Sequence, residues 1–141
     1  MVWRLAAVWR HAADVRLWRL LAALMFALAG LSHFLFPELF ARTIPPWIPF
    51  PRFWVAFTGV AELVGAWGLL TCRLRRAAGW GLMLLLVCVL PAHWHVATHP
   101  QQFAEFGLPG WAYWARMLLQ PVLVAWVWWV AVRRPSGRDD A

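Results

Sequence analysis

The sequence of 141 residues has no lysine, two cysteines and little charge. Charged residues make up 13% of it and hydrophobic residues 63%, whereas soluble domains are about 25% charged and about 45–50% apolar. A soluble globule of this size cannot bury so much apolar surface, and such low polarity also excludes disorder over most of the chain. Two cysteines exclude a disulfide scaffold, and no CxxC pair, flavin motif or iron–sulfur spacing is visible. The composition therefore predicts a lipid environment.

Four apolar runs are long enough to cross a bilayer, since a spanning helix needs about 20 mostly apolar residues. Barrel strands would alternate over about ten residues, which these runs do not do. We therefore expect an all-α membrane protein, a four-transmembrane-helix bundle within residues 17–132. The spans lie at about residues 17–36, 53–71, 77–97 and 111–132. Before them we expect a cytoplasmic or interfacial segment at 1–16, and after them a disordered cytoplasmic tail at 133–141.

The arginines set the expected orientation. The chain has 13 arginines and no lysine. Ten of the arginines lie at or near the N-terminal segment, in the turn at 73–76 and in the C-terminal tail, whereas Arg42 and Arg52 lie on the other side and Arg116 lies inside the fourth span. By the positive-inside rule these regions are cytoplasmic, so both termini lie in the cytoplasm and the loops at 37–52 and 98–110 face outward. A net charge of +7 arranged in this way indicates membrane topology, and we expect no nucleic-acid binding.

Prolines shape the outer half of the predicted bundle. Four of them in the loop at 37–52 forbid a continuous helix, but the loop is too apolar to stay free, so we expect a compact lid at the outer interface. Pro91 and Pro121 predict kinks in the third and fourth spans that would open a cavity.

Polar residues within the spans fall at one depth. An ionisable side chain is costly in lipid and faces the bundle interior. Glu62 lies about 13 Å below the outer end of its span at 1.5 Å per residue, and all four spans contribute to this layer. We predict that the ligand-binding residues of the layer are His33, Thr58, Glu62, His95 (with His93 as the alternative in the same span), Arg116 and Gln120.

Two interpretations of the layer stay open. Glu62 and Arg116 are expected to pair, and the pair either only holds the bundle together or also forms the polar floor of a pocket. The pocket would take a small amphipathic ligand such as a quinone, between apolar walls formed by Trp47, Trp94 and Trp111.

The histidines and cysteines suggest no other cofactor. A metal on His95 and His99 has no clear third ligand, and haem between His33 and His95 is the rarer use of such histidines, so we expect neither. Cys72 and Cys88 are expected to be free thiols.

Four strings of the sequence carry a family resemblance: GLSHFLFPELF, IPPWIPFPRFWVAFTGVAELVGAWGLL, RRAAGWGLMLLLVCVLPAHWHVATH and RMLLQPVLVAWVWW. Over about residues 20–130 they resemble the DoxX-like family of small bacterial membrane proteins. The resemblance implies a multi-pass protein of the bacterial cytoplasmic (inner) membrane, with links to thiosulfate:quinone oxidoreduction or to membrane thiol and oxidative-stress complexes. One departure is PAHWH, where relatives more often have Asn after Pro-Ala. The family motif falls on Thr58, Gly59, Glu62, Gly65, Arg116 and Gln120.

Three functions remain open from the sequence. The first is a protein that binds a ligand such as a quinone, or an accessory subunit of a membrane redox complex with a partner protein. The second is a structural or assembly factor whose Glu–Arg layer only holds the bundle. The third is a quinone-linked oxidoreductase subunit that takes electrons from a partner, so enzymatic activity is undecided. A homo-oligomer is compatible with each.

Overall fold

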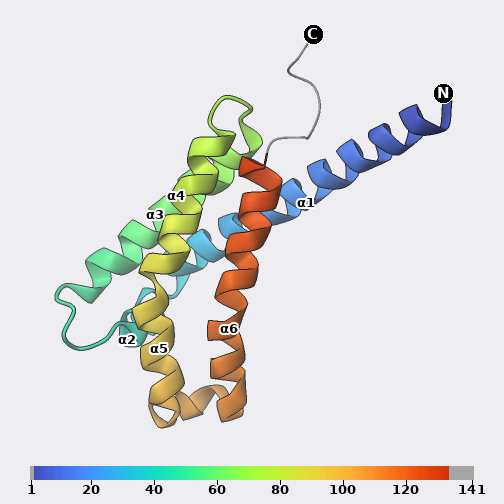
Figure 1. Ribbon diagram of the computed structural model, residues 1–141. Helices are drawn as coiled ribbons and strands as arrows, with labels where there is room; N and C mark the ends of the chain where they lie inside the picture. Colours follow the sequence, from blue (N-terminus) through green and yellow to red (C-terminus); the bar gives the residue numbers. More distant parts are fainter. Residues whose placement is uncertain (1, 134–141) are drawn as a thin grey trace.

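The computed structural model describes residues 2–133, which form helices joined by short connections (Figure 1). In chain order the elements are α1 (Val2–Leu35), α2 (Pro37–Thr43), α3 (Pro51–Leu70), α4 (Arg75–Cys88), α5 (Leu90–Thr98), the 3₁₀ helix η1 (Pro100–Phe106), α6 (Gly110–Val127) and the π-helical turn η2 (Trp128–Val132). No strand occurs among these residues, which confirms the predicted all-α class.

Four stretches of helix are long and apolar enough to cross a membrane: Asp14–Leu35, Pro51–Leu70, Arg75–Thr98 and Gly110–Val132. They correspond to the four predicted spans, with α4 and α5 forming the third and α6 and η2 the fourth. The shortest has 20 residues, which is about 30 Å of helix and matches the hydrocarbon core of a bilayer. Large apolar side chains on all four are exposed, as a lipid-facing surface requires. The chain is a multi-pass membrane protein.

The two ends of the chain were expected to lie outside the spans. Residues 2–16 continue the first span as helix, and this part of α1 extends beyond the other helices (Figure 1). The predicted disorder of the tail at 133–141 concerns residues that, apart from Arg133, lie outside the described part of the chain.

Prolines mark where several helices begin. Pro37 and Pro51 occupy the first turn of α2 and α3, where a missing N–H is tolerated. The third span breaks at Val89, two residues before Pro91, so the predicted kink is confirmed. In the fourth span the helix is not interrupted, because α6 runs through Pro121 as one element; the kink at Pro121 stays a prediction.

Glycines bring α1 and α3 into close contact. A Cβ at Gly30 would lie 2.8 Å from the carbonyl oxygen of Gly59, and a Cβ at Gly59 would lie 2.9 Å from the Cβ of His33. Real side chains do not approach so closely, so both positions must be small for the helices to cross as they do. Gly79 has the same role between α4 and η2, since its Cβ would lie 2.7 Å from that of Ala131.

The two ends of the bundle are packed differently. Near the turn at 71–74, buried apolar side chains from all four spans form the main core, among them Phe26, Leu69, Leu82 and Val127. The opposite end, where residues 36–50 and 99–109 connect the helices, is called the loop end below. A smaller cluster there consists of Val96, Ala97, Phe103 and Tyr113. The thinner packing leaves room for a cavity at the loop end.

Residues 37–50, called the lid segment below, connect α1 to α3, and α2 within them lies beside α5 (Figure 1). α2 within this segment contacts α1, α3 and α5. Arg42 donates a hydrogen bond from Nη2 to the carbonyl oxygen of Gln102 (3.0 Å), and Trp54 donates from Nε1 to that of Pro49 (3.1 Å). The segment packs against the helices and its first half is a helix that was not predicted, while Trp47 and Phe50 in its second half are exposed. Its position at the outer interface stays a prediction.

Candidate functional site

A cavity of about 560 Å³ lies beneath the lid segment, between α3 and the helix pair α4 and α5. Most of its walls are apolar. All four membrane spans also contribute a polar side chain to it: His33 from α1, Thr58 and Glu62 from α3, His93 from α5 and Arg116 from α6. The structure thus brings together four of the predicted site residues, His33, Thr58, Glu62 and Arg116.

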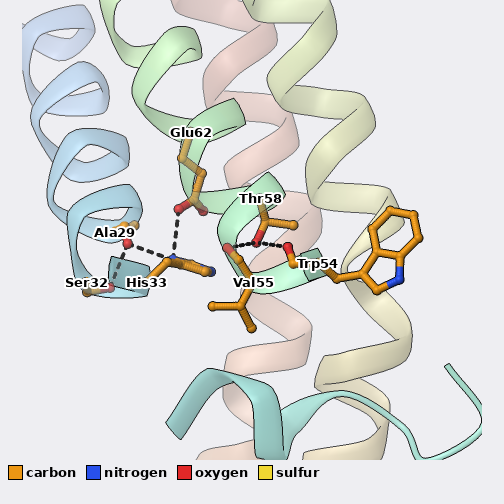
Figure 2. A network of polar contacts seen from close by, with 7 residues as sticks. All are labelled: Ala29, Ser32, His33, Trp54, Val55, Thr58 and Glu62. Carbon is orange, nitrogen blue, oxygen red and sulfur yellow. Dashed lines mark hydrogen bonds and ion pairs between the residues drawn. The ribbon is translucent and has the colours of Figure 1, made fainter. Parts of the chain in front are cut away.

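His33 and Glu62 meet across the α1–α3 crossing (Figure 2). The Nδ1 atom of His33 donates a hydrogen bond to the carbonyl oxygen of Ala29 (2.8 Å) and lies 3.4 Å from Oε2 of Glu62. The two side chains are 13% and 16% exposed. The ring of His33 also stacks on that of Phe40 in α2, with centroids 4.0 Å apart. The imidazole is therefore fixed from three sides.

The expected ion pair between Glu62 and Arg116 is not formed. Among the described residues, the ion-pair contact of Glu62 is with His33. Arg116 nevertheless faces the same cavity and acts on Glu62 through space. Oε2 of Glu62 is buried and has no hydrogen-bond partner in the described structure. Glu62 and Arg116 therefore line the same cavity as a hydrogen-bond acceptor and a hydrogen-bond donor.

His93 is held by Gln120. Gln120 is the one buried polar residue of the described core, at 6% exposed, and its Nε2 donates a hydrogen bond to Nε2 of His93. Its Oε1 is buried without a partner. Gln120 does not itself line the cavity, but it orients a side chain that does.

Two other predicted site residues lie elsewhere. His95 and Trp47 line a separate depression of about 220 Å³ on the other side of Pro91, together with Trp94. The reason is geometric, because residues two apart on a helix point about 200° away from each other. With α5 in its observed rotation, His93 turns to the cavity and His95 turns away. Trp111 lines neither space, so none of the three expected tryptophan walls belongs to the cavity.

The hydroxyl of Thr58 is satisfied within its own helix. Oγ1 donates to the carbonyl oxygen of Trp54 (2.9 Å) or of Val55 (3.0 Å), as Figure 2 shows. Its oxygen can still accept a hydrogen bond from a molecule in the cavity.

Phe40 and Cys88 are among the cavity residues that were not expected from the sequence. Phe40 belongs to the unpredicted helix α2. Cys88 lies seven residues after Gly81, on the same face of α4. Both cysteines are free, as predicted, and both are also exposed, so Cys88 is a natural chemical probe of this space.

No group of three His, Cys, Asp or Glu side chains in the described structure is close enough to hold a metal ion. The rings of His95 and His99 are 4.6 Å apart between centroids, but they form a pair only. His33 and His95 line different spaces, so the structure does not present them as two haem ligands.

The comparisons with known proteins give one match. A family described as a domain of unknown function, DUF8561, matches residues 21–131. No curated protein and no solved structure matches the chain. The matched residues contain the whole cavity and nearly all of the four spans. The chain belongs to the DUF8561 family.

Proposed function

We propose that this protein binds a small amphipathic ligand, such as a quinone, inside the membrane. One observation carries the proposal: polar side chains from all four spans converge on a single, otherwise apolar cavity of about 560 Å³. Ligand sites are typically about 300–1,000 Å³ and combine apolar walls with a few placed polar groups.

The polar groups suit a ring that carries oxygen atoms. Arg116 supplies N–H donors for a carbonyl oxygen, and the unpartnered Oε2 of Glu62 accepts from a hydroxyl group. The reduced form of a quinone has both functions on one ring, because one hydroxyl oxygen can accept from Arg116 while the other hydroxyl donates to Glu62; the oxidised form can only accept. The rings of Phe40 and His33, stacked on each other, form part of the cavity wall.

The same proposal includes a location and an orientation. Both termini lie in the cytoplasm, because the arginines cluster at the end of the bundle that holds the 71–74 turn. The cavity then lies in the outer half of a bacterial inner membrane. The DoxX-like resemblance supports a role as accessory subunit of a membrane redox complex, alone or as a homo-oligomer.

A structural or assembly role is the second candidate, and one observation favours it. The His33–Glu62 contact joins α1 to α3, and the Gln120–His93 hydrogen bond joins α6 to α5. Polar contacts of this kind hold membrane helices together without any ligand. If the role is structural, the protein should not fold without Glu62. If the role is ligand binding, the protein should fold without Glu62 but should not bind the ligand.

Alkylation of Cys88 tests the proposal. The purified protein in lipid nanodiscs is treated with N-ethylmaleimide, with or without a benzoquinone whose ring is fully substituted by methoxy and methyl groups. Such a ring has no free position for thiol addition. Mass spectrometry then follows Cys88 and, as an internal control, Cys72, which lies in the distant turn. We expect the quinone to slow modification of Cys88 and leave Cys72 unchanged.

Two variants separate the candidates. Glu62→Gln is expected to fold and to lose the protection of Cys88 by the reduced form of the same ring, whose hydroxyl group donates to the carboxylate. Glu38→Gln is the matched control, because Glu38 is an exposed carboxylate of the lid segment that pairs with Arg52 outside the cavity. If the quinone does not protect Cys88 in the wild type, the proposed function is refuted. A Glu62→Gln protein that fails to fold supports the structural role.

A further inference from the structure

The cavity is covered toward the aqueous phase at the loop end. Its cover there consists of the lid segment, in which Pro45 is buried and Phe40 and Ile48 are half-buried. Arg42 and Trp54 hold this segment down by the hydrogen bonds described above. A ligand that came from water would have to displace a packed segment.

The side of the cavity between α3 and α4 is open. Several lining residues are at the same time exposed on the outer surface of the bundle, where lipid chains would contact them. Trp54 is 41% exposed, Phe57 is 52% exposed and Leu84 is 65% exposed. Gly81 and Cys88 are exposed cavity residues as well. The cavity is therefore continuous with the lipid-facing surface, and this gap is called the lateral opening below.

Gly81 leaves space in the lateral opening. A Cβ built at Gly81 would meet no atom within 4 Å, in contrast to Gly79 two residues earlier. Helix packing therefore does not require a glycine at this position. Glycine is unfavourable inside a helix by about 1 kcal/mol relative to alanine. Gly81 lines the cavity and is exposed, so the space beside it is open.

We infer that the ligand carries a hydrocarbon tail, which leaves the cavity through the lateral opening past Gly81 and lies in the bilayer. This inference rests on the proposed function, and it narrows the ligand class to a polar ring with an alkyl or isoprenoid chain. The polar ring occupies the space between Glu62, His33 and Arg116, and the tail follows the exposed apolar side chains of α3 and α4. Access from the membrane needs no movement of the lid segment.

The test compares two probes on one substituted glycine. The tailed probe is decylubiquinone, and the short probe is the same ring with a methyl group in place of the decyl chain. Gly81→Leu fills the lateral opening without a clash at Cβ. Gly110→Leu is the matched control, because a Cβ there also meets nothing within 4 Å and Gly110 lies outside the cavity. For each protein in nanodiscs, we measure the concentration of each probe that halves the rate of Cys88 alkylation.

We expect Gly81→Leu to raise this concentration about tenfold or more for the tailed probe. The reason is that the leucine would displace about two methylene groups of the tail from the opening, and burial of each methylene group is worth about 0.8 kcal/mol. The value for the short probe and both values for Gly110→Leu should stay within about twofold of the wild type. The inference is wrong if the short probe protects the wild type but Gly81→Leu changes the values for both probes by the same factor. It is also wrong if Gly81→Leu changes neither value. In both cases the tail does not pass Gly81. If neither probe protects the wild type, the proposed function itself fails.

Discussion

The close crossing of α1 and α3 predicts that alanine is tolerated less well at Gly59, which lies in the crossing, than at Gly81, which lies in α4 away from it. The methyl group of Gly59→Ala would lie 2.9 Å from both the Cβ of His33 and a ring carbon of Phe34, and 3.1 Å from the carbonyl oxygen of Gly30. Overpacking of this kind costs about 1–3 kcal/mol. Gly81→Ala meets no atom within 4 Å, so it adds no such cost.

Both changes gain the same helix propensity, about 0.8–1 kcal/mol for alanine over glycine. This gain cancels when the two variants are compared, so their free energies of unfolding should differ by the overpacking cost of about 1–3 kcal/mol. Gly81→Ala should be more stable than the wild type by about 0.8–1 kcal/mol, and Gly59→Ala should lie between about the wild-type stability and about 2 kcal/mol below it. The assay is unfolding by SDS in mixed micelles, followed by circular dichroism. Equal stabilisation by both changes would refute the close packing at Gly59, and with it the contact that brings His33 to Glu62.

Three further predictions concern parts of the structure outside the cavity. Tyr113→Phe removes the buried hydrogen bond from the Tyr113 hydroxyl to the carbonyl oxygen of Phe103 (2.9 Å), and the same SDS assay should show a loss of about 0.5–1.5 kcal/mol; an unchanged free energy would mean that this bond does not hold η1 to α6. Glu38→Gln breaks the 2.7 Å pair with Arg52, but both side chains are exposed, so stability should change by less than about 1 kcal/mol. A green fluorescent protein fused after Ala141 should fluoresce and an alkaline phosphatase fused there should be inactive; the reverse pattern would contradict the cytoplasmic C-terminus.

The sequence was sufficient for the depth of the polar residues and insufficient for the direction in which they point. Depth follows from counting residues along an apolar run, and this places His33, Glu62 and Arg116 at one level, where they line a common cavity. Direction depends on how each helix is rotated about its axis. The break at Val89 resets that rotation for α5, so His93 rather than His95 faces the cavity.

Partners within the layer also depended on tertiary structure. Opposite charge predicted a pair of Glu62 with Arg116, but the two glycines of the α1–α3 crossing bring His33 closer to Glu62. The helix α2 was missed because four prolines dominate the second half of its loop, whereas Pro37 is a favourable residue for starting a helix. Phe40 was missed for the same reason.

The central claim is that the cavity binds an amphipathic ligand through Glu62, and native mass spectrometry tests it most directly. Wild type, Glu62→Gln and Glu38→Gln are released from micelles that contain decylubiquinol, the reduced form with two hydroxyl groups. We expect one bound quinol on the wild type and on Glu38→Gln, and none on folded Glu62→Gln. A wild type without bound quinol, or a Glu62→Gln protein that retains as much of it as the wild type, would show that the cavity does not bind such a ligand through Glu62.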